Sequence, residues 1–399
     1  MKPRLSVTSR FRLFFAFDFA AIGIFFPFMA LYLASIGLSG GQVGILLAVV
    51  PLTRFLVQPV WGAVSDIYHL HRHALALACI GLAGASALLG LTTDFSLLLP
   101  LMIIISTMQA PISPLGTALA LEHLERSGRR DRFGSLRLWG SIGFAVMVFV
   151  IGAAFVEDAV WLIIPCYVLT AVMLGVIALT LPDAEIHLGM NWRAGIALVA
   201  REHALLRFLA GGLLVGATLG VVNSYFTVYM SDIRASGWVI GVALAVSALG
   251  EVPLMAMASA FLARWGLHLV LVGGIALLPV RWLLYTVIEE PILVIPTQVI
   301  HSIAIMSLFV VGVIYVDQQL ARAWRATGQG LYAAASHGIG PSIGLVGAGF
   351  VYERAGIQPV WLACAVVALM GVLTINSAVR SPLREHFRGT SGTPAQAED

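Results

Sequence analysis

Apolar runs of about 20 residues recur along the whole of this chain, and each is long enough to cross a lipid bilayer as an α-helix. The composition agrees, because 59% of the 399 residues are hydrophobic and only 11% are charged, with a mean hydropathy of +0.95. A soluble domain carries roughly a quarter charged residues, so this chain has too few charges to cover a water-exposed surface. The sequence therefore predicts an all-α membrane protein.

Charged and turn residues divide the chain into twelve predicted spans. Their boundaries are expected near residues 11–36, 42–65, 74–93, 96–121, 133–156, 159–181, 204–231, 237–262, 267–288, 291–316, 327–352 and 357–379. The polar segment between the sixth and seventh spans suggests the following division: a first half 1–181, a central cytoplasmic linker 182–202, a second half 203–380 and a polar, disordered tail 381–399.

The distribution of basic residues predicts the orientation in the membrane. With the N-terminus placed inside, nearly all of the 23 Lys and Arg residues fall in cytoplasmic segments or adjoining span ends, and the outer loops hold only Arg234 and Arg354. Basic residues accumulate on the cytoplasmic side, so both termini are expected in the cytoplasm, with the chain multi-pass in a plasma (bacterial inner) membrane. This asymmetry explains the pI near 8.9 without a nucleic-acid partner.

Signatures of metal sites, disulfides and enzymes are missing from the sequence. Cys79, Cys166 and Cys364 lie singly in different apolar runs, without CxxC or Cys/His spacing. The spans contain no HExxH, GxSxG or paired-Asp motif. We therefore expect no metal, no cofactor and no enzymatic activity.

The two halves of the chain resemble each other. "GAAFVED" (152–158) ends the fifth span and "GAGFVYE" (347–353) ends the eleventh, while "LYLASIGLSGGQVGILLAV" near the first hairpin matches "VYMSDIRASGWVIGVALAV" in the second half. Duplicated six-helix halves with the same orientation are typical of parallel-repeat transporters, whose site lies between the halves near mid-bilayer. In this register Arg54 corresponds to Glu251, so opposite charges occupy equivalent positions.

Ionisable residues inside the spans mark the candidate site. A charge at mid-bilayer costs at least about 2.5–3.5 kcal/mol, so it normally faces the bundle interior and has a partner. The residues concerned are Asp18, Arg54, Arg137, Glu251, Arg281, His301 and His337. Single members could simply hold helices in register, but a set at comparable depth in both halves favours a functional role.

The chemistry of these groups suggests how a proton could be coupled to a solute. Glu251 and His301 can exchange protons, whereas arginine stays charged and can hold either a carboxylate or an anionic substrate. A carboxylate that alternates between an arginine partner and a proton is a workable coupling device. Nearby aromatic residues could contact substrate, although each could instead be a packing or interfacial residue. Gly and Pro in "SHGIGPSIG" (336–344) permit close packing and bending.

Several motifs resemble the major facilitator superfamily. "WGAVSD" (61–66) is similar to the signature after span two, although "IYHLHR" replaces its usual Arg-Gly-Arg ending. A stronger resemblance is to the branch that includes lactose permease, nucleoside–proton symporters and phenylpropionate permease. It rests on "RLWGSIGFA", "GEVP", "VRWLLY", "QVIHS" and "GQGLYAAASHGIG". The resemblance implies twelve transmembrane helices in two pseudo-symmetric six-helix halves, with Arg137 and Glu251 paired near the substrate and Arg281 with His301 in a proton relay.

Departures from the branch narrow the expected activity. The acid that follows the relay histidine in lactose permease is replaced by Ala304, which leaves Glu251 or Asp18 as the proton carrier. "GTALALEH" in span four offers no clear counterpart to the substrate-binding acid of lactose permease, which argues against galactosides. The Gly-Pro motif typical of drug–proton antiporters is missing from span five, which favours import.

We predict a monomeric secondary active transporter, a proton-coupled symporter that imports a small organic solute by alternating access. Three embedded arginines against two acids favour an aryl carboxylate. A nucleoside or sugar symporter, proton-coupled efflux, and a non-transporting sensor on a transporter fold are the alternatives. The predicted sites are Asp18, Arg54, Arg137, Trp139, Tyr225, Tyr229 and Tyr332 for substrate, Glu251, Arg281 and His301 for the proton, and Gly62, Asp66, Gly340 and Pro341 for gating.

Overall fold

The computed structural model describes residues 6–68, 71–129, 132–183, 203–320 and 324–380, and every secondary-structure element in these ranges is a helix. The predicted all-α class is confirmed. The predicted domain boundaries stay a prediction, because most of the linker and all of the tail lie outside the described residues.

The first half consists of six membrane crossings. Its helices are α1 (Val7–Ser35), α2 (Gly40–Tyr68), α3 (His71–Leu89), α4 (Phe95–Gln109), α5 (Ile112–Arg126), α6 (Phe133–Phe155), the 3₁₀ turn η2 (Val160–Leu162) and α7 (Ile163–Thr180). The fourth crossing is divided into α4 and α5 where Pro111, which has no N–H to donate, interrupts the helical hydrogen bonds.

The second half repeats this plan with more interruptions. Its helices are α9 (His203–Asp232), α10 (Gly237–Ala256), α11 (Ala258–Ile275), α12 (Leu277–Val287), η3 (Pro291–Leu293), α13 (Val294–Met306), η4 (Ser307–Val311), α14 (Gly312–Gln319), α15 (Arg325–Ala333), η6 (Ala334–Ile339), α16 (Gly340–Ala355) and α17 (Ile357–Val379). Both η4 and η6 are π-helical. The chain turns within α11 at Gly266, where φ is +74° and glycine avoids the strain of a side chain.

The predicted number of spans agrees with this architecture. Within the described ranges, eleven helical stretches are long and apolar enough to cross a bilayer, and the broken stretch α15–η6–α16 supplies a twelfth. The boundary expected between the eighth and ninth spans falls at the Gly266 turn, because α10 ends early at Ala256 and α11 begins before the turn.

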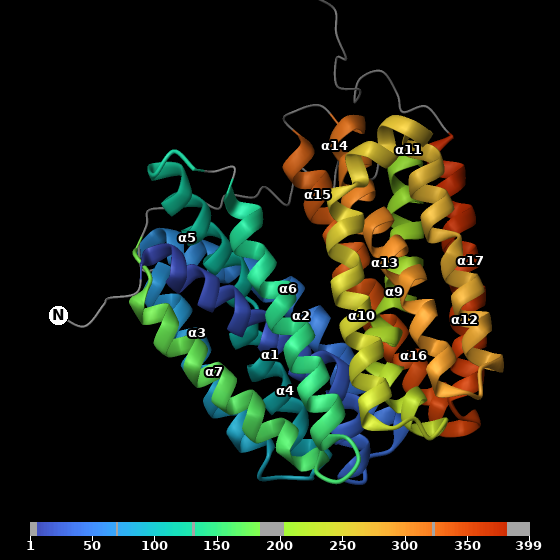
Figure 1. Ribbon diagram of the computed structural model, residues 1–399, viewed down its shortest axis with the longest axis horizontal. Helices are drawn as coiled ribbons and strands as arrows, with labels where there is room; N and C mark the ends of the chain where they lie inside the picture. Colours follow the sequence, from blue (N-terminus) through green and yellow to red (C-terminus); the bar gives the residue numbers. More distant parts are fainter. Residues whose placement is uncertain (1–5, 69–70, 130–131, 184–202, 321–323, 381–399) are drawn as a thin grey trace, which may run out of the picture.

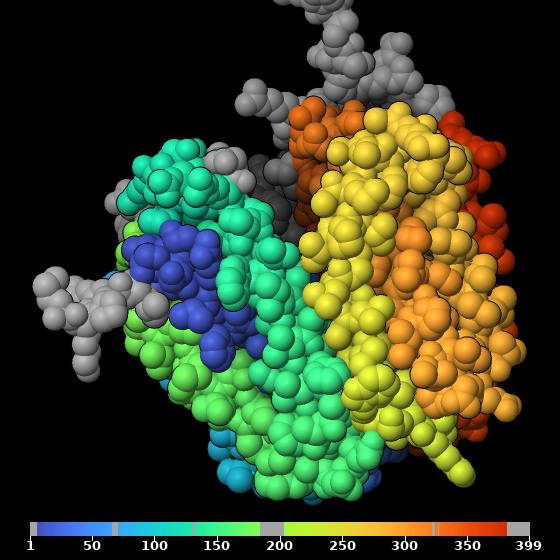
Figure 2. Space-filling view, in the orientation of Figure 1, coloured from blue at the N-terminus to red at the C-terminus, as the bar shows by residue number. Residues whose placement is uncertain are grey.

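The helices form two bundles that stand side by side, α1–α7 in blue to green and α9–α17 in lime green to red (Figure 1). In the first bundle α1 packs against α6 and α7, and in the second α9 packs against α16 and α17. The two bundles meet where α6 contacts α10, α2 contacts α16 and α1 contacts α9. The space-filling view shows α6 and α10 touching in the lower part and a cleft between them toward the top (Figure 2).

Glycines allow this close contact between the halves. A Cβ on Gly349 of α16 would lie 2.5 Å from the carbonyl oxygen of Gly40 and 2.8 Å from the Cα of Gly44, both on α2. A Cβ on Gly152 of α6 would lie 2.7 Å from the Cα of Gly241 on α10. Small residues let membrane helices approach backbone to backbone, so side chains at these positions would hold the halves apart.

Two acids reinforce the same contact by capping helices of the opposite half. Glu157, which follows α6, accepts the N–H of Gly237 at 2.6 Å at the start of α10. Glu353 of α16 accepts the N–H of Gly41 at 2.7 Å at the start of α2, and the hydroxyl of Ser39 at 3.2 Å. The first N–H groups of a helix have no partner within it and carry a partial positive charge, so a carboxylate is a favourable acceptor there. We call this end of the molecule the capped end and the opposite end the open end.

Replacing Gly349 by a larger residue should separate the two halves at the capped end. In Gly349→Val the new side chain meets backbone that cannot rotate away, and overpacking of about 1–3 kcal/mol would shift the conformational equilibrium roughly five- to 150-fold. Spin labels on Leu91→Cys, in the turn after α3, and on Val287→Cys, at the end of α12, should report a longer distance in a background without native cysteines, because both exposed positions lie at the capped end. Gly347→Val is the matched control, because a Cβ there meets nothing within 4 Å. Equal distances in both variants would contradict the prediction.

Removing the two caps should loosen the same end without steric conflict. In the double variant Glu157→Ala with Glu353→Ala, the first amides of α10 and α2 lose their charged acceptors, each contributing about 1.5–3 kcal/mol. Hydrogen–deuterium exchange at the start of both helices should therefore quicken by about tenfold or more. Asp158→Ala, one residue after the first cap, serves as control. Unchanged exchange at Gly41 and Gly237 would show that the caps do not stabilise this contact.

Candidate functional site

The first half contributes a buried cluster around Asp18. Asp18 lies on α1 with 4% of its surface exposed, and the hydroxyl of Ser113 on α5 donates to its Oδ2 at 2.6 Å. The charges of Arg137 on α6 and Arg54 on α2 both act on this carboxylate. Two of the predicted arginines therefore act on the same buried acid. This is expected, because an unpaired charge inside the bilayer is costly.

Arg137 connects this cluster to the other half. Its guanidinium lies over the ring of Phe19, 3.7 Å from the centroid, which is a cation–π contact. Its charge acts on Asp18 and also on Glu251 of α10. The charges of Arg137 and Glu251 therefore act on each other across the two halves, while their pairing near the substrate, which the family resemblance implied, stays a prediction.

Arg54 makes a similar connection on the other side. Its guanidinium lies 5.7 Å from the ring centroid of Phe26, and its charge acts on Asp18 and on His337 of η6. The side chain of His337 is exposed, and its Nδ1 lies 2.9 Å from the hydroxyl oxygen of Ser336. The centroids of the His337 and Phe309 rings are 4.2 Å apart. The two predicted arginines of the first half thus each face an ionisable group of the second.

The second half holds a fully buried network around Arg281 of α12. Its Nε and Nη2 donate to the hydroxyl of Tyr285 at 3.1 and 2.7 Å, and Nη2 also donates to Oε1 of Gln298 at 2.9 Å. Nη1 is in contact with Nδ1 of His301 on α13. With 1% of its surface exposed, Arg281 has its guanidinium satisfied by neutral partners, rather than by a carboxylate.

The tautomer of His301 follows from this geometry. An arginine can only donate, so Nδ1 must accept and the proton of the neutral ring must be on Nε2. That nitrogen lies 3.8 Å from Oε1 of Glu251, too far for a direct hydrogen bond and close enough for one to form after a small movement. Arg281 and His301, the residues predicted for the relay, therefore lie next to Glu251, whose side chain is 29% exposed.

Close packing of α10 on α13 places Glu251 beside His301. A Cβ on Gly250 would lie 2.8 Å from Oγ of Ser302, and that hydroxyl donates to the carbonyl of Ser247 at 3.0 Å. Small residues on both helices thus bring the backbone before Glu251 close to the helix that holds the histidine.

The predicted aromatic residues lie in different environments. Trp139 is 41% exposed, whereas Tyr225, Tyr229 and Tyr332 are buried, with their hydroxyls directed to main-chain carbonyl oxygens at 3.5, 3.4 and 2.7 Å. Tyr229 stacks on Tyr285 and lines a pocket of about 270 Å³ near the capped end. Among the described residues, none of these tyrosines forms a hydrogen bond with a charged side chain, although Tyr229 stacks on Tyr285 of the Arg281 network, and their substrate role stays a prediction.

The predicted gating residues of the second half lie beside the π-helix η6. A Cβ on Gly340 would lie 2.4 Å from the carbonyl oxygen of Leu213 on α9, and Pro341 packs directly on Gly220. A π-turn leaves a helix locally irregular and is frequent at functional sites. In the first half, Gly62 is buried in α2, and the side chain of Asp66 lies outside the described residues.

Three contacts of the site were missing from the sequence prediction. Gln298 precedes His301 by three residues, a spacing that places both on one helix face and could have revealed it. Ser113 and Phe19 carry no such signal, because their partners Asp18 and Arg137 are brought to them by packing between helices.

Comparisons with known proteins agree with the motif resemblance. The model of the "MFS_1 like family" matches residues 8–363. The maltose permease of Geobacillus stearothermophilus is 28% identical over 92% of this chain and 93% of its own. A probable 3-phenylpropionic acid transporter of Escherichia coli K12 is 26% identical over 88% of this chain and 92% of its own. The crystal structure of the nucleoside transporter NupG (D323A mutant) superposes with a TM-score of 0.86 at 19% identity, covering 94% of this chain and 100% of that chain.

Removing the amide of Gln298 should destabilise the second half. In Gln298→Leu the guanidinium of Arg281 loses a buried acceptor, and an unsatisfied buried group costs about 1–3 kcal/mol or more when it is charged. The melting temperature of the purified protein in detergent should therefore fall. Val299→Leu, on the neighbouring exposed position, should leave it unchanged. A melting temperature equal to that of the parent would mean that Arg281 does not depend on Gln298.

Proposed function

The chain belongs to the MFS_1 like family of membrane transporters, and from this premise we propose that it is a proton-coupled symporter importing a small organic solute by alternating access. The observation that carries the proposal is the placement of Arg137. Its charge acts on Asp18 within its own half and on Glu251 across the cleft. An attraction of this kind between the halves can weaken and form again when the halves move, as alternating access requires.

Protonation of Glu251 gives a physical mechanism for coupling. The ionised carboxylate is attracted to Arg137 and lies near the Nε2–H of His301. Once Glu251 takes a proton, it no longer neutralises Arg137, which is then free to hold an anion. One monovalent anion and one proton entering together leave the charge of the buried site unchanged, which avoids the cost of an unpaired charge.

We propose an aryl carboxylate as the substrate. Arg137 would hold the carboxylate, and the rings of Phe19 and Phe26, which lie beside Arg137 and Arg54, would offer apolar contacts to an aromatic group. The name of the probable 3-phenylpropionic acid transporter is consistent with this choice. The names of the maltose permease and of the nucleoside transporter NupG favour a sugar or nucleoside as the second candidate.

The predicted cytoplasmic termini would place the capped end outside the cell and the cleft toward the cytoplasm. The structure would then correspond to the state that releases substrate inward. A bacterial inner membrane is the proposed location, with the proton gradient as the energy source and no cofactor.

The proposal is tested with purified protein in liposomes that contain a trapped pH dye. A panel of aryl carboxylates, nucleosides and sugars is added outside, and protein-free liposomes correct for passive entry of weak acids. Acidification that requires both the protein and an aryl carboxylate would support the proposed symport. Acidification by a sugar or nucleoside alone would establish the second candidate. Binding without acidification would favour another coupling ion or a sensor without transport activity.

Glu251→Gln should separate exchange from accumulation. Glutamine keeps the size and hydrogen-bonding ability of the side chain but cannot carry the proton, so exchange of substrate should persist. Accumulation driven by a pH gradient, which for one proton reaches about tenfold per pH unit, should disappear. Glu290→Gln, at an exposed position of the same half, should accumulate like the parent. Undiminished accumulation by Glu251→Gln would exclude Glu251 as the proton carrier.

A further inference from the structure

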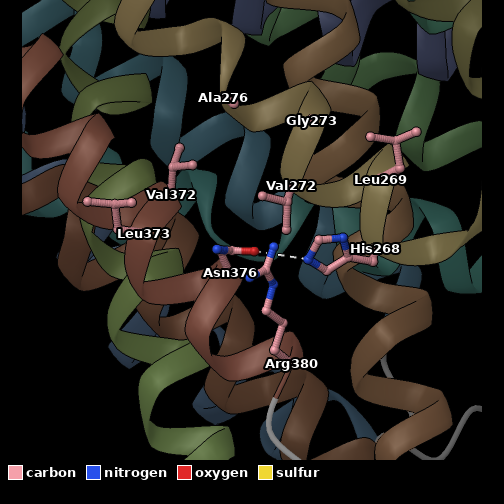
Figure 3. Close-up of a pocket in the computed structure, with 9 residues that line it drawn as sticks. All are labelled: His268, Leu269, Val272, Gly273, Ala276, Val372, Leu373, Asn376 and Arg380. Carbon is pink, nitrogen blue, oxygen red and sulfur yellow. Dashed lines mark hydrogen bonds between the residues drawn. The ribbon is translucent and has the colours of Figure 1, made fainter.

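A groove of about 270 Å³ lies between α11 and α17, on the side of the second half that faces away from the first (Figures 1 and 3). It is lined by His268, Leu269, Val272, Gly273, Ala276, Val372, Leu373, Asn376 and Arg380. Leu269 and Leu373 are each 58% exposed, so the walls of the groove are apolar surface available to lipid.

One end of this groove is polar. Nε2 of His268 lies 2.9 Å from Oδ1 of Asn376, and Figure 3 shows the guanidinium of Arg380 directed toward this pair. Arg380 is exposed, and among the described residues no carboxylate forms an ion pair with it. A cation and an imidazole therefore meet at the point where the apolar groove ends.

The polar end lies at the level of a membrane surface. His268 follows the turn at Gly266, and Arg380 is the residue at which α17 ends. Trp265, 52% exposed, has the guanidinium of Arg264 at 5.8 Å from its ring. Exposed tryptophan and arginine beside a helix end are typical of the region where lipid headgroups meet the hydrocarbon. The groove thus runs from the headgroup level into the apolar layer.

We propose that this groove binds one molecule of an anionic phospholipid. The phosphate lies at Arg380 and His268, and an acyl chain follows the groove along Leu269, Val272 and Leu373. The groove has a polar end and apolar walls, which argues for a lipid. A soluble anion could bind at the polar end but would make no favourable contact with the apolar walls. Basic pockets between membrane helices on the cytoplasmic side are suited to acidic headgroups, and the predicted orientation places this end there.

The site is separate from the transport machinery. The groove lies between α11 and α17, neither of which makes the contacts between the halves that involve α2, α6, α10 and α16. Lipid binding can therefore be tested on its own, and the test does not depend on the proposed substrate or on proton coupling.

The headgroup part is tested by native mass spectrometry of the full-length protein with phosphatidylglycerol or phosphatidylcholine. The parent should bind one phosphatidylglycerol more tightly than phosphatidylcholine. Arg380→Ala should weaken phosphatidylglycerol binding about fivefold, the share expected of one cation near an acidic headgroup, and leave phosphatidylcholine unchanged. Arg354→Ala, an exposed arginine at the capped end, is the control. Equal affinity for the two lipids in the parent, or no effect of Arg380→Ala, would overturn the proposal.

The acyl-chain part needs a second variant. A Cβ on Gly273 meets only the end of the Leu269 side chain, at 3.6 Å, so Gly273→Leu should fold normally while filling the groove. It should weaken binding of phosphatidylglycerol, with an unchanged melting temperature in the absence of lipid. Displacement of the lipid by inorganic phosphate at equal concentration, or unaltered lipid binding by Gly273→Leu, would show that the groove holds an anion without a chain and would overturn the lipid assignment.

Discussion

The backbone contact between the halves at the capped end is the constraint on which the rest of the structure depends. Gly349 lies on Gly40 and Gly44, Gly152 lies on Gly241, and a carboxylate from one half caps a helix of the other at each contact. Gly152 lies in the repeated segment 152–158 and Gly349 in its counterpart 347–353. The internal repeat of the sequence thus produces two similar contacts between the halves. Because both lie at one end, the halves diverge toward the other and leave the cleft of Figure 2.

Within this arrangement, each half supplies most of the hydrogen-bond or charge partners of its own buried ionisable groups. Asp18 has Arg54, Arg137 and the hydroxyl of Ser113, while Arg281 is held by Tyr285, Gln298 and His301. Glu251 differs, because the arginine whose charge acts on it belongs to the other half. In the proposed alternating access this attraction weakens when the halves separate, so protonation offers a way to avoid a bare charge.

The sequence predicted those features that depend on local pattern. Apolar runs gave the crossings, and the motifs around Arg137, Glu251, Arg281 and His301 identified residues that lie together in the structure. The sequence did not predict contacts between helices that are far apart in the chain. These include the hydrogen bond from Ser113 to Asp18 and the helix caps by Glu157 and Glu353. An aromatic residue in a span does not reveal whether it faces a cleft or packs inside a bundle, which is why the predicted tyrosines were found in buried positions.

The geometry of the caps also restricts how the molecule can change state. Each acid accepts an N–H of a helix in the other half, and Glu353 also accepts the hydroxyl of Ser39, so separation of the halves at the capped end breaks both caps together and leaves five polar groups to be solvated. At that end water can replace the lost acceptors, and in the half-buried site around Arg137, where the Glu251 side chain is 29% exposed, a proton or a substrate anion can compensate the charges as well. The cost of opening therefore includes about 1.5–3 kcal/mol for each cap as well as the separation of the central charges. The strength of the caps and the occupancy of the central charges should together decide which state is populated.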